Sequence, residues 1–394
     1  MGMVKRKIGD ILTLQRGYDL PASKMEGGNV AVVGSNGIIG YHNIVKYDAP
    51  CIIVGRSGSV GKVRYYSIPT WPHNTALFVK DFKGNDPLYL YYFLKNLHLD
   101  EKFSKSSSVV PSLDRNIVHS LHVQFQEDIN EQKNIAKILS AFDIKIALNR
   151  QINDNLEAMA KQLYDYWFVQ FDFPDENGKP YKSNGGKMVW NECMKKSIPA
   201  DWKTSLLSEW IDYSLERVST SVVSDGDFYT PIEVIPRNKM SLSTTLPVEN
   251  AVSGLCRYKK KDILLSNRRV YFHKICLAPF DGLTRDTVMV LRPKHEENLG
   301  YIYETMFSDS FISYATKVSY GSLQPVLSWT EAQKYHVLTP AKNLSEKYGK
   351  LINGIIEKVL SSQMEIIQLT KQRDELLPLL MNGQATVNYH LSDD

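Results

Sequence analysis

One glycine-rich segment carries residue types that could hold a phosphate group. The stretch GRSGSVGKV at residues 55–63 follows an apolar run and ends in Gly-Lys before Val63, much as the P-loop of nucleotide-binding proteins ends. A P-loop, however, has four residues between its glycines and a Ser or Thr after its lysine. Here five residues separate Gly55 from Gly61, and a valine follows Lys62. The segment therefore favours a structural turn between strands, or a turn that contacts nucleic acid, over a nucleotide site.

The nucleic-acid interpretation depends on the side chains of this turn. Cations and hydroxyl groups gathered in one short loop suit phosphate oxygens and the edges of bases. The candidate DNA-contacting residues of the first half are Arg56, Ser57, Ser59, Lys62 and Arg64.

The second half of the chain has an equivalent segment, SNRRVYFHK at residues 266–274. The preceding apolar run is retained, but Arg56 aligns with Asn267 and Ser57 aligns with Arg268. Two domains that recognise different DNA sequences would share the apolar run and differ in the polar loop residues. Ordinary sequence drift between duplicated halves would give the same pattern. The candidate residues here are Asn267, Arg268, Arg269 and Lys274.

A second loop in each half combines small polar residues with lysines. The tetrapeptide KSSS at residues 105–108 aligns with SYGS at residues 319–322, because 319 − 105 = 214. Exposed loops of this composition are commonly only connections, so a structural role and a DNA-binding role both stay open. The candidate residues are Lys105, Ser107, Lys317, Tyr320, Ser322 and Gln324.

The common motifs of catalysis and metal binding are missing from the sequence. It contains no HExxH, no GxSxG, no GxGxxG after a strand-like run, and no NPPY or DPPY tetrapeptide of amino-methylating DNA enzymes. Its four cysteines form no CxxC pair, and Cys51 and Cys276 lie in apolar runs typical of a core. We therefore expect no catalytic residue, no metal site and no cofactor bound by this chain.

An internal repeat indicates how these loops are positioned. Residues 104–169 and 316–387 share a polar loop, a short apolar strand and a long amphipathic helix. His122 and Lys133 match His336 and Lys347 at the same offset, since 336 − 122 = 347 − 133 = 214. A chain built in this way has two equivalent globular heads and two equivalent helices.

Each half ends in a long helix with one narrow apolar stripe. Apolar residues recur at steps of three and four, without Gly or Pro, over about forty residues of 127–169, which predicts a helix of about 60 Å. Such a stripe favours a coiled coil over a helix buried in a large domain. In the first helix it consists of Ile135, Leu139, Phe142, Ile146, Leu156, Met159 and Leu163.

The second helix is predicted over residues 343–382, with Gly383 as its stop. Its stripe includes Ile352, Ile355, Val359, Ile366, Leu369 and Leu376. Since each stripe needs a partner, the simplest arrangement pairs the two helices as an antiparallel coiled coil and places the heads at opposite ends, related by a pseudo-twofold axis.

These patterns divide the chain into five segments. Mixed α/β heads are predicted at 1–126 and 202–341, long helices at 127–169 and within 342–394, and a Pro- and Gly-rich linker at 170–201. The frame strands of the two heads are expected at Cys51–Val54 and Asp262–Leu265.

Composition sets wider limits. The 394 residues are 43% hydrophobic and 23% charged, with a net charge of +4 that permits a polyanionic partner without requiring one. No apolar run is long enough for a membrane span, and the first residues do not have the pattern of a secretory signal. A cytoplasmic protein with reduced cysteines is the expectation.

The arrangement resembles the specificity subunits of type I restriction–modification systems. Three parts of the sequence carry the resemblance: EQKNIAKIL at 131–139, FDFP at 171–174 together with the nearby NGKPY at 177–181, and KQRDELLPLLMNG at 371–383. They look like the conserved regions of that family, and the two heads look like its target recognition domains. The likeness covers almost the whole chain.

The resemblance implies a non-catalytic subunit that recognises double-stranded DNA. Each head would recognise half of a bipartite target, and the coiled coil would set the spacer and dock two modification (M) methyltransferase subunits, with restriction (R) motor-nuclease subunits added for cleavage. S-adenosylmethionine, ATP and Mg²⁺ would then be bound by those partners. Two alternatives remain: a coiled-coil scaffold with two binding heads, and a DNA-modifying enzyme with an unrecognised motif.

Overall fold

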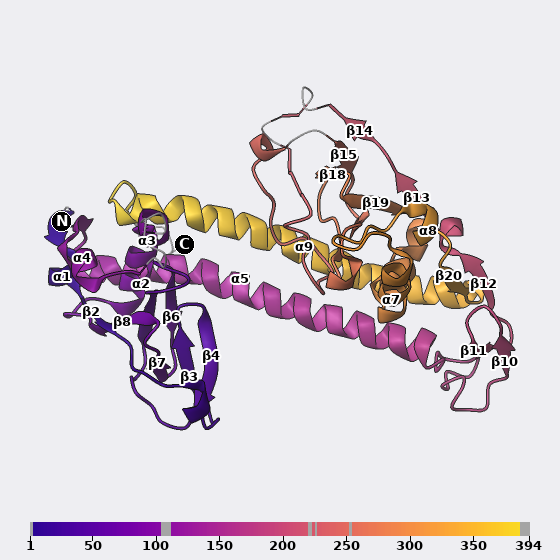
Figure 1. Ribbon diagram of the computed structural model, residues 1–394, viewed down its shortest axis with the longest axis horizontal. Helices are drawn as coiled ribbons and strands as arrows, with labels where there is room; N and C mark the ends of the chain where they lie inside the picture. Colours follow the sequence, from indigo (N-terminus) through magenta and orange to yellow (C-terminus); the bar gives the residue numbers. More distant parts are fainter. Residues whose placement is uncertain (1–2, 104–111, 220–222, 225–226, 252–253, 387–394) are drawn as a thin grey trace, which may run out of the picture. The chain divides into compact units, whose positions relative to one another are not determined.

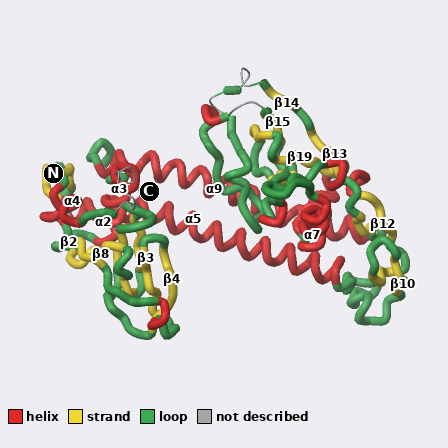
Figure 2. The backbone as a smooth tube through the Cα atoms, in the orientation of Figure 1, coloured by secondary structure: helices red, strands yellow, loops and turns green. Residues whose placement is uncertain are grey.

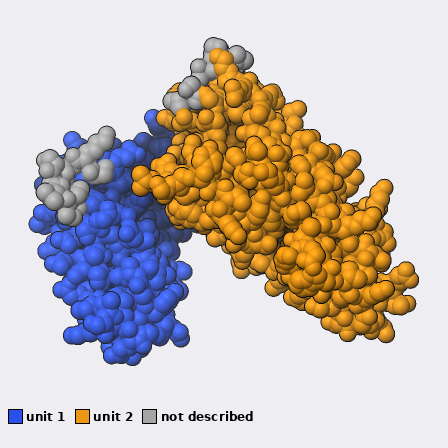
Figure 3. All heavy atoms as spheres, turned by 45° about the vertical axis from the view of Figure 1, so that its right-hand side comes forward, with its two compact units in different colours: residues 1–144, 370–394 blue, residues 145–369 orange. Residues whose placement is uncertain are grey.

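The computed structural model describes residues 3–103, 112–219, 223–224, 227–251 and 254–386. The chain forms two compact units, one of residues 1–144 with 370–394 and one of residues 145–369 (Figure 3). Each of the two long helices contributes one part to each unit. Among the described helices, none is long and apolar enough to cross a membrane.

The first unit is built around a four-stranded antiparallel sheet (Figures 1 and 2). Its order is β2 (Thr13–Arg16), β8 (Ala76–Asp81), β5 (Cys51–Gly55) and β6 (Val63–Tyr66). Strand β5 is buried along its whole length because both faces of its Cys-Ile-Ile-Val run are covered. The predicted frame strand of the first head is thus a central strand of the sheet.

Shorter elements complete this unit. A three-stranded sheet has the order β4 (Gly37–His42), β3 (Val30–Gly34) and β7 (Thr70–Pro72), and a two-stranded ladder joins β1 (Val4–Lys7) to β9 (His122–Phe125). The short helices are α1 (Ile8–Ile11), α2 (Pro87–Asn96), α3 (Leu99–Phe103) and α4 (Arg115–Ser120). The Asp86 carboxylate accepts a hydrogen bond from the Tyr89 amide and caps α2, as expected for an Asp-Pro helix start.

The second unit has a four-stranded antiparallel sheet of the same order. It runs β13 (Ile211–Ser214), β19 (Val288–Pro293), β16 (Ile263–Ser266) and β17 (Ile275–Leu277). The predicted frame strand again lies at its centre, beginning at Ile263 rather than Asp262. A ladder of β12 (Lys203–Leu206) with β20 (His336–Thr339) repeats the β1–β9 pairing, with Leu206 opposite His336 as Lys7 is opposite His122.

The remaining elements of the second unit differ more from the first. Its three-stranded sheet, β14 (Arg217–Val218), β15 (Leu255–Tyr258) and β18 (Gly282–Arg285), is entirely antiparallel, whereas β3 and β7 pair in parallel. Its short helices are α6 (Leu299–Phe307), α7 (Asp309–Val318) and α8 (Trp329–Ala332).

The two long helices form close to where the sequence predicts them. Helix α5 (Ile129–Tyr164) continues into a π-helical turn, Asp165–Val169, and α9 spans Lys342–Met381. Gly383 follows α9 with a left-handed φ of 68°, and its amide donates to the Leu380 carbonyl. This confirms Gly383 as the helix stop, because glycine adopts that conformation without strain.

Contacts between α5 and α9 occur within both units. In the second, Asn149 of α5 donates to the Glu365 carboxylate at 2.9 Å, and the rings of Tyr164 and Tyr348 lie 6.4 Å apart. Later residues of α5 therefore meet earlier residues of α9, which is an antiparallel pairing. In the first unit, Asp143 of α5 contacts Arg373 of α9 at 2.5 Å.

Most residues of the predicted apolar stripes are buried or partly buried. Six of their residues are at most 5% exposed: Ile135, Leu139, Ile146, Ile352, Val359 and Ile366. Partly buried are Phe142, Leu156, Leu163, Ile355, Leu369 and Leu376.

The assignment of Met159 to the stripe is wrong, since this side chain is 56% exposed. Ala160 is fully buried in its place, followed by Tyr164. With 3.6 residues per turn, one step along the helix rotates a side chain by about 100°, so the buried face passes through Ala160 rather than Met159.

Residues 170–201 are a packed part of the second unit rather than a free linker. Strands β10 (Met188–Asn191) and β11 (Lys196–Pro199) form a hairpin. Phe173 is 8% exposed and lies between the rings of Tyr181 and Trp202, at 4.7 and 5.2 Å. The Pro and Gly residues make turns here, but the aromatic side chains between them are anchored in the core.

Removing the Arg373 guanidinium should destabilise the first unit. Its side chain is 14% exposed and pairs with Asp143, which also accepts a hydrogen bond from Tyr92 at 2.7 Å. Arg373→Ala leaves a partly buried carboxylate without its cation, so we expect a loss of about 1–3 kcal/mol in the free energy of unfolding.

Urea unfolding of the full chain measures this loss. Arg6→Ala is the matched control, because the Arg6–Glu127 pair is about half exposed and surface ion pairs contribute little to stability. An effect of Arg373→Ala no larger than that of the control would contradict the structural importance of this contact.

Candidate nucleic-acid interface

In the second unit, the two loops that the sequence singles out lie side by side. The segment after β16 pairs with the segment before α8: Leu327 donates its amide to the Asn267 carbonyl at 2.9 Å, and Arg269 donates to Pro325 at 2.9 Å. An antiparallel bridge joins Arg268 to Val326. The polar tip beyond the frame strand is thereby held against the loop that contains Tyr320, Ser322 and Gln324.

The first unit has the same pairing at equivalent positions. Leu113 donates to the Arg56 carbonyl at 2.9 Å, and Ser57 bridges to Ser112. The offsets agree with those in the sequence, since 268 − 57 = 211 and 326 − 112 = 214. The predicted residues Lys105 and Ser107 lie outside the described residues.

The side chains of the second unit divide into free and engaged groups. Tyr320 is 63% exposed and Lys317 is exposed at the end of α7. Arg268 is half-buried, and its guanidinium makes no hydrogen bond or ion pair with any residue that the structure describes. Arg269 donates to the Leu323 carbonyl at 3.5 Å. These groups can meet a ligand without first breaking strong internal contacts.

Two other candidates of this unit have internal partners. The Lys274 ammonium donates to the carbonyls of Ile232 at 2.6 Å and Glu233 at 3.4 Å, and burial lowers its pKa. The side chain of Asn267 donates to the Asp286 carbonyl at 2.8 Å. Both residues therefore hold the loop in place.

Most of the candidates in the first unit also stabilise their loop. Arg64 donates to the Ser35 carbonyl at 2.5 Å, and Ser59 bonds the side chain of Asn36. Ser57 and Arg56 make weaker contacts, at 3.4 Å, with the carbonyls of Thr75 and Asn74. Lys62 is exposed.

The glycine-rich turn is shaped by packing. Gly61 has a φ of +77°, and a Cβ there would lie 2.2 Å from the amide nitrogen of Asp100. Only glycine fits so close to the start of α3 in that conformation. This packing accounts for the Gly-Lys pair without a nucleotide.

Lys62 and Arg64 reach a basic cavity that the sequence did not reveal. A cavity of about 460 Å³ in the first unit is lined by these residues together with Lys95 of α2 and Arg373 of α9. Burial, with a smaller contribution from Arg373, lowers the pKa of Lys95. Four cations against Asp100 and Asp374 make the site suitable for a phosphate oxygen. Lys95 and Arg373 are far from the loop in sequence, so only the fold brings them to it.

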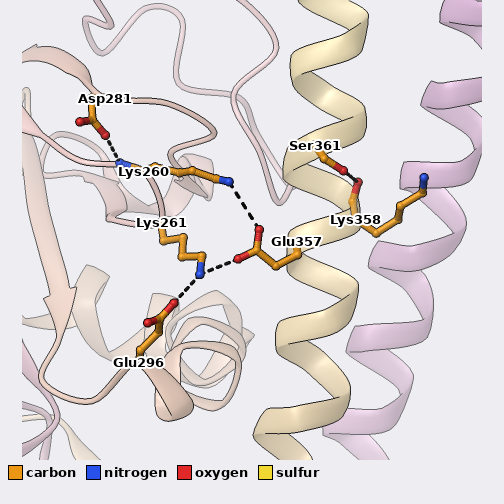
Figure 4. Close-up of polar contacts among 7 residues, drawn as sticks. All are labelled: Lys260, Lys261, Asp281, Glu296, Glu357, Lys358 and Ser361. Carbon is orange, nitrogen blue, oxygen red and sulfur yellow. Dashed lines mark hydrogen bonds and ion pairs between the residues drawn. The ribbon is translucent and has the colours of Figure 1, made fainter.

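Ion pairs attach the second sheet to α9. Lys260 and Lys261, in the turn before β16, contact Glu357 of α9 at 3.5 and 2.5 Å, and Lys261 also pairs with Glu296 (Figure 4). We call these four residues the ion-pair clamp. The next residue, Asp262, is 2% exposed and accepts two hydrogen bonds from Arg292. The clamp thus fixes the frame strand, and the loop beyond it, relative to the helix.

The described residues include no metal centre. Within the described ranges, no three or more His, Cys, Asp or Glu side chains are grouped to hold a metal ion. What the two units present are paired backbone loops with cationic, hydroxyl and aromatic side chains, which are groups suited to phosphates and base edges.

The clamp should lose strength in acid. Hydrogen bonding to Lys261 holds the pKa of Glu357 below its ordinary value of 4.5. A carboxylate with a lowered folded-state pKa contributes stability above pH 4.5, and this is lost as the pH falls through the lowered pKa.

Glu357→Gln tests this contribution. Because Glu357 is 44% exposed, we expect the substitution to cost at most about 1 kcal/mol at neutral pH, and the difference from wild type to shrink below pH 4.5. Glu346→Gln, on the same helix but with only a 3.9 Å pair to an exposed lysine, is the control. Thermal melting as a function of pH measures both, and a pH-independent difference would rule out the clamp.

Comparison with known proteins supports a family assignment. Residues 1–158 match the family model of the type I restriction modification DNA specificity domain. The chain is 25% identical over 325 residues to the specificity subunit of the type I restriction enzyme MjaIX of Methanocaldococcus jannaschii, covering 76% of this chain and 69% of that one. It is 24% identical over 362 residues to the HindI specificity subunit of Haemophilus influenzae, covering 76% and 77%.

A solved structure shares the fold. The S subunit of a type I restriction–modification system from M. genitalium superposes with a TM-score of 0.60 over 96% of both chains, at 18% identity. The resemblance to type I restriction–modification specificity subunits that the sequence motifs indicated is thereby confirmed.

Proposed function

We propose that this chain is the DNA-recognition subunit of a type I restriction–modification complex and that each of its two heads recognises one half of a bipartite target. The observation that carries the proposal is the repeated loop pairing, Arg268 with Val326 in one unit and Ser57 with Ser112 in the other. Two sheets of the same strand order support these pairs. An internal duplication of one recognition module accounts for both features.

The long helices would act as a ruler. Their buried stripes and the antiparallel contacts of Asn149 with Glu365 and of Tyr164 with Tyr348 favour a coiled coil of fixed register. The length of such a coil would set the number of unrecognised base pairs between half-sites, as dimer geometry sets half-site spacing in other DNA-binding proteins. The ion-pair clamp would keep the second head in a constant position on its helix.

Partner subunits would supply the chemistry. We infer that two M subunits dock on the helices and carry S-adenosylmethionine, and that R subunits supply ATP- and Mg²⁺-dependent cleavage of double-stranded DNA. The helices leave apolar residues for such docking, for example Ile144, Leu148 and Ile152, which are 59%, 54% and 42% exposed. A modest net charge of +4 is compatible with partners that share the phosphate contacts.

The two alternative functions predict different results for the purified chain and the reconstituted complex. A DNA-modifying enzyme would methylate or cleave DNA as a purified chain with S-adenosylmethionine or Mg²⁺ alone. A protein-binding scaffold would leave the reconstituted complex without salt-dependent, sequence-specific DNA binding. Reconstitution with and without M subunits, followed by methylation and binding assays on DNA of the mapped target, separates all three.

Arg268→Ala should impair recognition of one half-site only. If its free guanidinium contacts a base edge, we expect the free energy of DNA binding to fall by about 1–3 kcal/mol. This loss should occur only on DNA in which the half-site recognised by the second head is intact. Arg56→Ala should affect the other half-site in the same way. Binding of the reconstituted complex to DNA with substitutions in one half-site at a time, at fixed salt, measures the effect.

The control is Arg217→Ala, which removes an exposed arginine on β14, outside both loops. We expect it to leave half-site discrimination unchanged. If Arg268→Ala weakens binding equally for every half-site variant, Arg268 contacts phosphate and the base-edge assignment fails.

A further inference from the structure

A second kind of site lies in the second unit, between α5 and α6 and beside the start of α7. Here a cavity of about 520 Å³ has walls formed by Tyr164, Met240, Tyr303 and Phe307. That volume is in the range of small-molecule sites, and its aromatic lining is typical of them. Among the residues that line it, His273 is the contribution of the candidate DNA-contacting segment 266–274.

An acidic side chain lies in this cavity without a partner. Glu304 of α6 is 3% exposed, lines the cavity, and makes no hydrogen bond or ion pair within the described parts of the chain. Burial raises its pKa to about 8. A buried carboxyl group with no partner is costly, so its presence indicates a ligand that supplies the missing contact.

The groups that face Glu304 make the cavity predominantly acidic. Asp154, Glu157, Asp165 and Asp309 also line it. Lys161 is the cation that acts on Glu304, but its ammonium is paired with Asp165 at 2.7 Å. Lys239 nearby pairs with Asp154 and Glu157, and the His273 ring forms a hydrogen bond with the Phe307 carbonyl at 2.7 Å.

The equivalent position in the first unit is occupied differently. Helices α2 and α6 align at an offset of 212, since 299 − 87 = 212, and Tyr89 and Tyr91 then match Tyr301 and Tyr303. Glu304 matches Tyr92, whose phenol donates to Asp143 of α5 at 2.7 Å. One unit closes this position with an aromatic side chain and an internal hydrogen bond, whereas the other leaves a carboxyl group facing a cavity.

We propose that this cavity binds an aliphatic diamine or polyamine, with one ammonium group against Glu304 and the carbon chain along the aromatic wall. Carboxylates spaced around an apolar cavity fit several nitrogens on a flexible chain. Tyrosine rings beside the cavity also attract cations through their faces. A divalent metal ion fits less well, because the described carboxylates form no group of three placed to coordinate one.

Binding should be linked to proton release. Below pH 8, Glu304 is mostly protonated in the free protein. An ammonium group beside it favours the carboxylate, so the amine displaces a proton to solvent and the affinity rises as the pH approaches 8 from below.

Isothermal titration of the full chain with spermidine tests the proposal. We expect saturable binding with one site, and a heat that differs between Tris and phosphate buffers because a proton is released. Glu304→Gln should weaken binding by about tenfold to a hundredfold and abolish the buffer dependence. Glu297→Gln, the same change at an exposed residue of this unit, should do neither.

Several results would overturn the proposal. One is the absence of saturable binding to the wild-type chain, which decides the matter even if Glu304→Gln does not fold. Another is equal competition by MgCl₂ at matched ionic strength, which would indicate an unspecific ion atmosphere. Tighter binding of N-acetyl-lysine methylamide than of spermidine would assign the cavity to a lysine side chain of a protein partner instead.

Discussion

The structure depends on two helices that each have one apolar face and must cover it. Ile352, Val359 and Ile366 of α9 are almost completely buried, and so are Ile135 and Leu139 of α5. Each buried side chain of this size contributes about 1.5–3 kcal/mol relative to exposure, which is far more than a surface ion pair contributes. The apolar faces therefore supply the stability. The polar contacts at Asp143 and Glu365 favour one register and orientation, because a shift along the helix would separate them.

The position of the candidate DNA-contacting loops depends on the same helices. In the second unit, the ion-pair clamp attaches the turn before β16 to α9, and β16 is a central strand of its sheet. The strand ends where Asn267 and Arg268 pair with the segment before α8. A side chain at this tip is thus connected to the helix by a short strand and backbone hydrogen bonds. Such rigid support is what sequence-specific contacts require, because base edges differ only by the positions of donors and acceptors.

The sequence predicted those features that depend on local pattern. Local patterns predicted the frame strands, the long helices and the Gly383 stop. The repeat predicted that the polar loops of one half correspond to those of the other. The packing of residues 170–201 into the second unit was missed, since Pro and Gly signal turns but do not reveal that Phe173 is buried between Tyr181 and Trp202. The internal contacts of Lys274, and the approach of Lys95 and Arg373 to the first loop, involve segments distant in sequence. No local pattern contains them.

The ruler is the central claim, and matched insertions in the two helices test it most directly. Seven residues continuing the stripe would be added between Leu148 and Asn149 in α5 and between Glu365 and Ile366 in α9, which are opposed in the second unit. The added length is about 10 Å, or about three base pairs of B-form DNA. Methylome sequencing of a strain that expresses this variant with its M subunits should find both half-sites unchanged and the spacer longer by about that amount. An unchanged spacer in a variant that still methylates would contradict the ruler.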